Sequence, residues 1–378
     1  MKTLCHVLLA SFAFFLIQPK LKAVCPFCAA TGLSYRQRFE FADVVALATL
    51  QSTQKSDNIS TGLFIVVDTI KPGPIKIGDQ LTIAYYGPEN LAERFLIQGV
   101  EPPEIIWDLP VSVSEPVVSY LKEVNHLQDD SLDRLKFFAQ HLEHKELIIT
   151  QDAYDEFAIA PYDEILKIKD AFDRNNLRQW IEDPTIPTPR KQLYYMLLSA
   201  CGVADDADWM EQRLRSEDPL MRQGLDALTA SYLSLSGAKG LSVIDELFIQ
   251  NRQREFAETF AVLAAMRFHA TEGKIIEPLE ISNRLATMLD REEIVDLVVP
   301  DLARMEDWRH IDRLMNLFWK SYETKITAIR TPTINYLRAC PLPEAQKALK
   351  DIEDKDPGAI KRAKGLIPFL PQKSPAKG

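Results

Sequence analysis

The pattern of apolar and polar residues changes its period near residue 129, so the chain divides into two regions of different secondary structure. Before this point, short runs rich in Val, Ile, Phe and Tyr are separated by turn-forming residues, as in the strands of an antiparallel sheet. A loop rich in Pro and Gly, KPGPIKIGD, interrupts any helix between the second and third runs. The predicted strands are 42–50, 63–70, 80–86 and 94–98, and a short helix is predicted at 34–41.

From Ser131 onward, apolar residues recur at three- and four-residue spacing, which predicts amphipathic helices. After two such segments near 132–142 and 144–158, the helices fall into pairs whose second members recur about every 29–38 residues. A single pair cannot bury its apolar face alone, so we expect neighbouring pairs to stack. The predicted helices beyond residue 160 are 161–172, 175–183, 190–201, 205–215, 219–235, 239–250, 254–269, 274–289, 291–306, 308–319, 322–339 and 343–352.

These patterns carry two resemblances. The paired helices resemble HEAT-like α-solenoids over about 129–352. The order of a cysteine pair, a helix, FADVVALATL and IKPGPIKIGDQLTI is similar to netrin/TIMP-like modules, which are small barrels of the OB type, over about 25–100. The spacing here is Cys-x-x-Cys where those modules have Cys-x-Cys. That resemblance implies inhibition of a metalloprotease by the α-amine of the first cysteine, which would apply to Cys25 only if the chain is cleaved after Val24.

We therefore expect an α+β protein with two domains. A small antiparallel, OB-like β module occupies 24–128, and an α-helical, HEAT-like repeat domain occupies 129–352. The last segment, 353–378, contains Pro, Lys, Ser and Gly and little to bury, so it is expected to be a mostly disordered tail.

Residues 1–23 have the features of a signal peptide. Lys2 supplies the positive start, an uncharged apolar stretch follows, and Leu21 and Ala23 occupy the −3 and −1 positions of a cleavage site. The apolar run is about 15 residues, shorter than the roughly 20 that a membrane-spanning helix needs. We expect a periplasmic, cell-envelope or secreted protein with no stable membrane insertion after cleavage. Retention of the leader as an anchor remains the alternative.

Charge and composition narrow the class of partner. The formal net charge of the 378-residue chain is −10, and removing the three lysines of the leader makes it about −13. This balance is a poor match to nucleic acid or anionic lipid, so neither is expected as a partner. Because 46% of the residues are hydrophobic, apolar cores can stabilise both domains without a dense disulfide framework.

The pair Cys25 and Cys28 has three interpretations. A thioredoxin-like centre requires a preceding strand, and only the leader precedes this pair. A zinc site requires further ligands at suitable spacing, and none is evident. We therefore predict a structural disulfide between the two cysteines, with a thiol–disulfide oxidoreductase as the alternative function.

Other candidate residues have structural explanations beside their functional ones. His141 and His144 lie three residues apart and are candidates for a binding site, but their spacing does not match a zincin motif, so we assign no metal. Asp152, Asp155 and Glu156 are expected to face solvent on a helix. Trp107 lies in a Pro-rich connection between the two domains. It is expected either to seal the junction between them or to lie in a binding groove.

No catalytic motif or cofactor site is recognisable in the sequence. Repeat arrays of helices expose long, regular surfaces and enclose few pockets. The sequence therefore predicts an exported, non-enzymatic scaffold that binds a protein partner through its helical repeats. Thiol–disulfide exchange through the cysteine pair and inhibition of a metalloprotease by the N-terminal segment are the alternatives.

Overall fold

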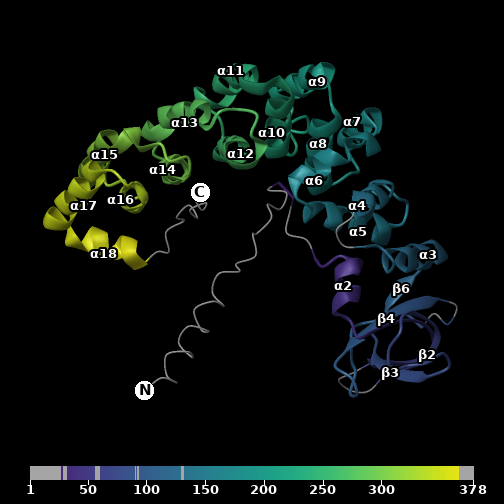
Figure 1. Ribbon diagram of the computed structural model, residues 1–378. Helices are drawn as coiled ribbons and strands as arrows, with labels where there is room; N and C mark the ends of the chain where they lie inside the picture. The colour runs from purple at the N-terminus through teal and green to yellow at the C-terminus, as the bar shows by residue number, and fades with distance from the viewer. Residues whose placement is uncertain are drawn as a thin grey trace, which may run out of the picture.

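The structure, a computed structural model, contains an antiparallel β-sheet followed by a long array of helices (Figure 1). This arrangement confirms the expected α+β class, with a small antiparallel module before a helical region. The array forms an arch that curves away from the sheet (Figure 1). The residues that the structure describes are 27–28, 32–55, 60–89, 91, 93–128 and 132–365. The predicted leader lies outside these residues.

The sheet contains six strands, and a twelve-residue strand lies at its centre. This central strand pairs antiparallel with the second strand on one side and with the fourth on the other. The third strand extends the sheet beyond the second, and the last two strands both pair with the fourth. Four of the six strands coincide with the predicted runs. In chain order the strands are β1 (Val44–Lys55), β2 (Ser60–Lys71), β3 (Gln80–Ala84), β4 (Arg94–Val100), β5 (Ile106–Trp107) and β6 (Val111–Val113).

Both faces of β1 are buried over its first seven residues, Val44–Leu50, because a different set of side chains covers each face. Val45 and Leu47 belong to the large core that the sheet shares with the helices. Ala48 and Leu50 pack with Phe64 in a smaller core formed by the sheet alone. A strand covered on both faces has a continuous apolar run, which explains why VVALATL does not alternate with polar residues.

Two helices connect the sheet to the array. Helix α2 (Tyr35–Phe41) precedes β1 as predicted, and the Ser34 hydroxyl caps its first turn in a capping box. Helix α3 (Glu115–Val124) follows β6, and its Lys122 forms an ion pair with Asp68 of β2 at 2.6 Å. Both helices therefore belong to the junction between the sheet and the array.

Helix α3 of the junction lies before the predicted boundary between residues 128 and 129, within the range expected for the β module. In this helix Val117, Leu121 and Val124 are buried and recur at four- and three-residue spacing. That spacing is the helical pattern, although the strand-like runs before it obscure the change of period.

The helical array has two layers, because consecutive helices alternate between the inner and outer sides of the arch (Figure 1). Helices α4 (Leu132–Ala139) and α5 (Leu147–Ala158) begin the array beside the junction. The inner helices are α6 (Tyr162–Lys167), α8 (Thr188–Cys201), α10 (Leu225–Ser236), α12 (Phe256–Phe268), α14 (Val295–Arg304) and α16 (Arg330–Ala339). The outer helices are α7 (Arg174–Glu182), α9 (Ala204–Arg215), α11 (Leu241–Ile244), α13 (Pro278–Thr287), α15 (Ile311–Thr324) and α17 (Pro343–Lys355).

The sequence patterns of the two layers differ because their environments differ. Helix α10 buries eight of its twelve residues, since it packs against α8, α9 and α12. Helix α17 buries only Ala345, Ala348 and Ile352, which form one stripe, and its charged residues face outward. Each helix predicted beyond residue 160 has a counterpart in the array.

The end of the array differs from the expected disordered tail over 353–378. Helix α17 continues to Lys355, and α18 (Pro357–Gly365) follows it. Ala359, Ile360 and Ala363 of α18 are buried in the main core. These small and branched side chains fit against α16 and α17, so a short apolar face is sufficient to hold the helix. Residues 366–378 lie outside the described part of the chain.

An ion pair joins α12 to α14 within the inner layer. Arg267 donates two hydrogen bonds to Asp301, from Nε to Oδ1 at 2.7 Å and from the other end of the guanidinium to Oδ2 at 2.9 Å. The Asp301 side chain is only 1% exposed and also contacts Arg304. This bidentate contact holds together two inner helices that are not consecutive in the chain.

Replacing Arg267 with Met is expected to lower the free energy of unfolding by about 2 kcal/mol, because it leaves the buried Asp301 with only Arg304. Urea denaturation followed by tryptophan fluorescence measures this loss. The control is Arg313→Met, since Arg313 contacts Asp290 at the same 2.7 Å distance on an exposed surface. The control should lose less than about 1 kcal/mol. Equal losses in the two variants would contradict a special role for the inner pair.

Candidate functional site

The carboxylates of α5 are buried, which corrects the expectation that they face solvent. Asp152, Asp155 and Glu156 are 2%, 7% and 0% exposed. The helix is covered on this side because α2 and α3 of the junction and α4 of the array pack around it. The basic residues that compensate these carboxylates come from distant parts of the chain, so the local sequence gives no sign of the burial.

Glu156 is the centre of a charged cluster between the junction and the array. One of its oxygens accepts hydrogen bonds from the Ser34 hydroxyl and from Arg36 Nε, the latter at 3.0 Å. The other oxygen accepts a hydrogen bond from the buried guanidinium of Arg134 on α4. The cluster therefore links the start of α2 to two helices of the array by charge-assisted hydrogen bonds.

Asp152 connects the same elements through neutral donors. Its Oδ1 accepts a hydrogen bond from the Tyr35 N–H at 2.6 Å, and its Oδ2 accepts one from the Tyr120 hydroxyl of α3 at 2.7 Å. Burial raises the pKa of Asp152 to about 7, because desolvation outweighs these two hydrogen bonds and the nearby charge of Glu156 adds to it. Burial also raises the pKa of Tyr120.

A groove of about 470 Å³ opens beside these carboxylates, between α2, α5 and the residues that precede α8. Leu33 and Leu147 are exposed at its walls, and the Arg38 guanidinium lies over the Tyr35 ring at 5.3 Å. Asp152, on the wall of this groove, accepts a hydrogen bond on each oxygen, and Asp155 Oδ1 accepts one from Gln151 at 2.8 Å. The lining of the groove is mixed apolar and charged. Its lining residues are Leu33, Tyr35, Arg38, Leu147, Ile148, Thr150, Gln151, Asp152, Asp155, Pro187 and Arg190.

The inner layer exposes a pair of aromatic side chains on α12. Phe256 and Phe260 are 54% and 44% exposed, and their rings stack with centroids 6.2 Å apart. Beside them, a second groove of about 470 Å³ separates the start of α12 from the start of α10. Pro219, Ala257 and Ala261 contribute apolar surface to this groove. The exposed aromatic pair and the groove together form what we call the α12 surface.

The α12 surface was missed by sequence analysis, although its signal is present. The segment FAETFAVLAAMRF is apolar around more of its circumference than one buried face requires. In a helix that packs on one side only, the surplus of aromatic residues indicates either a second layer or an exposed binding surface. The inner layer accounts for most of this surplus, and Phe256 and Phe260 are the part that remains exposed.

Phe27 packs against an inner helix that is distant from it in the sequence. It is 4% exposed, and its ring meets Phe268 of α12 edge to face with centroids 5.4 Å apart. Phe268 in turn meets Tyr162 of α6 at 5.3 Å in the same geometry. The cysteine-containing segment is therefore attached to the inner layer through an aromatic residue.

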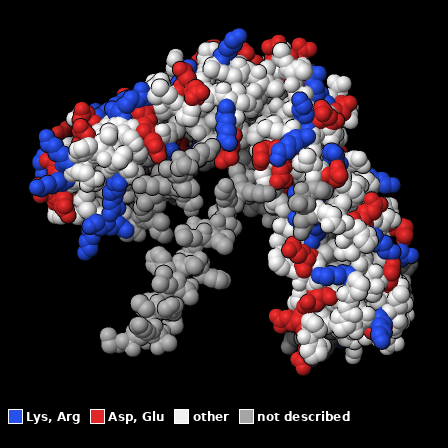
Figure 2. All heavy atoms as spheres, in the orientation of Figure 1, with Lys and Arg blue, Asp and Glu red and all other residues white. Residues whose placement is uncertain are grey.

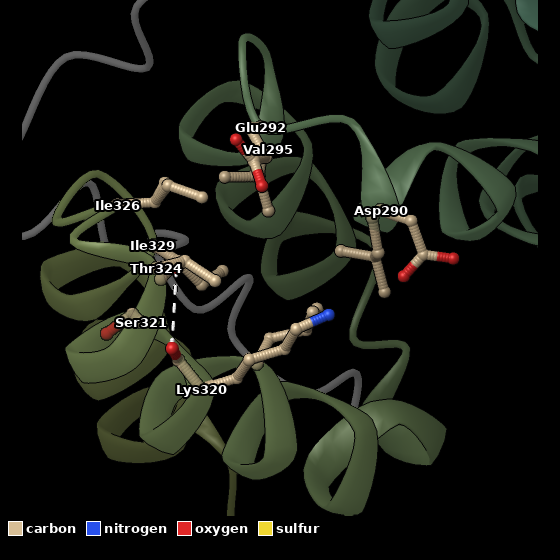
Figure 3. Close-up of a pocket in the computed structure, with 10 residues that line it drawn as sticks. Asp290, Glu292, Val295, Lys320, Ser321, Thr324, Ile326 and Ile329 are labelled. Carbon is tan, nitrogen blue, oxygen red and sulfur yellow. Dashed lines mark hydrogen bonds between the residues drawn. The ribbon is translucent and has the colours of Figure 1, made fainter.

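A small pocket of about 140 Å³ lies between α14 and α15. Figure 3 shows Ile326, Ile329 and Val295 on its apolar side, with Lys320 extending from α15 toward the side where Asp290 stands. Small-molecule sites usually have at least about 300 Å³, so this pocket accommodates no more than one apolar side chain. We assign no ligand to it.

The predicted histidine pair does not lie on one helical face. Helix α4 ends at Ala139, and both histidines follow it in a turn. The His141 Nδ1 lies 2.8 Å from the Phe137 carbonyl oxygen, and the His144 Nδ1 accepts a hydrogen bond from the Glu146 N–H at 3.1 Å. Each ring thus holds its own turn in place. A binding role for His141 or His144 stays a prediction.

The tryptophan at position 107 packs on the sheet and not against the helical array. Trp107 lies in β5 opposite Gly99 of β4, and its ring is partly buried against the two cores formed by the sheet. A side chain at Gly99 would clash with this ring, since its Cβ would lie 2.8 Å from Cε3 of Trp107. Trp107 therefore does not seal the junction, and a role in binding stays a prediction.

The predicted disulfide remains untested because Cys25 lies outside the described residues. Cys28 is half-buried, next to Phe27. Cys201 and Cys340 are free thiols at the ends of α8 and α16, and burial raises the pKa of Cys201 to about 11. That shift keeps the Cys201 thiol protonated and weakly reactive.

Two features are absent from the described part of the chain. No group of three or more His, Cys, Asp and Glu side chains is placed to hold a metal ion there. Within the same residues, no helix has the length and apolar character needed to cross a membrane.

Comparison with known proteins leaves the function open. No protein-family model matches the chain, and neither curated proteins nor solved structures give a significant match. The groove between α2 and α5 and the α12 surface are therefore the two candidate binding sites.

Proposed function

We propose that this protein is an exported, non-enzymatic scaffold that binds a protein partner through the inner side of its helical array. In this proposal the array is a HEAT-like solenoid and the sheet is an OB-like module. The observation that carries the proposal is the exposed, stacked pair of Phe256 and Phe260 on an inner helix. Aromatic residues of this kind are enriched at the centres of protein interfaces, where they contribute most of the binding energy.

The distribution of charge favours an apolar contact. On the face shown in Figure 2, Lys and Arg side chains alternate with Asp and Glu side chains along the arch and do not gather in one patch. Beside the aromatic pair, Arg222 and Arg254 both pair with Glu258, at 2.8 and 3.5 Å, and Arg254 also lies 3.7 Å from Glu217. A partner is therefore expected to bind through the aromatic pair, with these paired charges forming a polar rim.

Site-specific photo-cross-linking tests this proposal. A benzoyl-phenylalanine placed at Phe260 in the full chain is expected to give one discrete adduct in the extracytoplasmic fraction of the host. The matched control is the same group at Leu279, which is 56% exposed against 44% for Phe260 but lies on the outer helix α13. The adduct from position 260 should be lost when Phe256 is also replaced with Ala, because one half of the stacked pair is removed.

The outcomes separate the alternatives. The same set of adducts from positions 260 and 279 would overturn the proposal, because it would indicate random contact. Adducts that disappear on reduction, and that require Cys28, would instead support thiol–disulfide exchange.

A further inference from the structure

Phe27 is buried among residues that are distant from it in the sequence, since it is 4% exposed and belongs to the core of the helical array. Its ring meets the ring of Phe268, and Phe268 in turn meets Tyr162. Phe268 lies on α12 and Tyr162 on α6, so this series of ring contacts joins two inner helices. A side chain held this way acts as a ligand of the array, although it belongs to the same chain.

The receiving site is built from ordered residues. Phe268 is 2% exposed, and its ring also meets the ring of His269, which is itself buried. The Tyr162 hydroxyl lies 3.1 Å from the Ser199 hydroxyl of α8, which holds the tyrosine ring in place. Helices α6, α8 and α12 therefore hold the two rings in a fixed geometry. All three helices are distant from Phe27 in the sequence.

We propose that this site binds an aromatic side chain presented by a peptide segment of a partner, and that Phe27 occupies it as an intramolecular ligand. The proposal rests on the proposed scaffold function and names the chemical class of its partner. Edge-to-face contact with Phe268 favours an aromatic ring over an aliphatic side chain. Removal of Phe27 would leave the Phe268 ring as exposed apolar surface on the inner layer, which a second aromatic residue would cover.

Tethering gives the occupant an advantage over a free peptide. An occupant joined to its site by a short covalent linker has an effective concentration of the order of 1 mM. If the aromatic residue binds with a Kd of about 0.1 mM, the tethered Phe27 weakens a competing peptide roughly tenfold. A partner must therefore displace Phe27, and the sequence CPFC places a cysteine on either side of the residue that is displaced.

The test uses a fluorescein-labelled decapeptide that corresponds to residues 23–32, with Cys25→Ser and Cys28→Ser. Fluorescence anisotropy measures its binding to the full chain and to a full chain with Phe27→Ala. We expect the variant to bind the peptide about tenfold more tightly than the wild type. A peptide that carries Ala in place of its phenylalanine should bind neither protein.

Three further variants keep the test decisive. In the Phe27→Ala background, Phe268→Ala should abolish peptide binding, while Tyr162→Phe should preserve it because the ring is retained. Phe27→Leu fills the site with an aliphatic side chain and should show an intermediate affinity for the peptide. Circular dichroism confirms that each variant keeps its helical content.

Equal peptide binding by the wild type and the Phe27→Ala variant would overturn the inference, as would equal binding of the peptide that lacks phenylalanine. These outcomes are distinguishable from failure of the scaffold proposal. Cross-linking from Phe260 without aromatic peptide binding refutes the intramolecular ligand alone. Peptide binding without a discrete adduct from Phe260 refutes the partner surface on α12 and leaves the Phe27 site intact.

Discussion

Replacing Glu156 with Gln is expected to lower the free energy of unfolding by about 3 kcal/mol or more, because it leaves the buried guanidinium of Arg134 beside a neutral group. Glu156 is fully buried, and it also accepts hydrogen bonds from Ser34 and Arg36. Gln keeps the shape of the side chain, so the loss reflects charge and not a cavity. Urea denaturation at neutral pH, followed by tryptophan fluorescence, measures the effect.

Two controls define the cause of this loss. Asp133 on α4 pairs with Lys136 on an exposed surface, so Asp133→Asn should cost less than about 1 kcal/mol. A double variant with Arg134→Met and Glu156→Leu should recover part of the loss, because two apolar residues replace the buried pair. A loss in Glu156→Gln no larger than in the exposed control would show that the cluster does not stabilise the junction.

The pH dependence of stability is expected to contain a large contribution from Asp152. Its pKa rises from 3.8 to about 7 on folding, mainly through burial, so the folded protein retains a proton that the unfolded chain has released. The free energy of unfolding therefore falls as pH rises through this interval. For this single group, the fall amounts to about 2–3 kcal/mol between pH 5 and pH 8.

The variant Asp152→Asn isolates this contribution. Asn cannot ionise, and its amide can accept from the Tyr35 N–H while it donates to the Tyr120 hydroxyl, which accepts as readily as it donates. Groups with lowered pKa, such as Asp307, act in the opposite direction but are unchanged in the variant, so they cancel in the difference. We expect the difference in free energy of unfolding, wild type minus variant, to fall by about 2–3 kcal/mol from pH 5 to pH 8. Parallel profiles for the two proteins would exclude a raised pKa at Asp152.

Local patterns determined most of the secondary structure. The strand runs, the capping residue of α2 and the paired helices are periodic features that each segment carries on its own. Periodicity also predicted where one layer of helices would stack on the next, since a helix pair with one apolar face needs a neighbour. Helices α3 and α18 were not predicted because short helices next to turns have few periods to recognise.

The buried carboxylates and the site of Phe27 depend on tertiary structure. The segment QDAYDEF has the composition of a solvated helix face, and nothing within it records that Arg36, Arg134 and Ser34 will meet it. Likewise, no local feature of CPFC indicates that Phe27 will meet a ring 241 positions later in the numbering, at Phe268.

The sequence by itself determined the order of strands and helices, the α+β class and the apolar faces that drive stacking, because hydrophobic periodicity is a property of neighbouring residues. Only the tertiary structure decided which polar residues are buried and which aromatic residues remain exposed. Burial depends on which segments pack together in space. The shifted pKa of a buried carboxyl group and the exposure of an aromatic ring therefore depend on tertiary packing and not on the residue type alone.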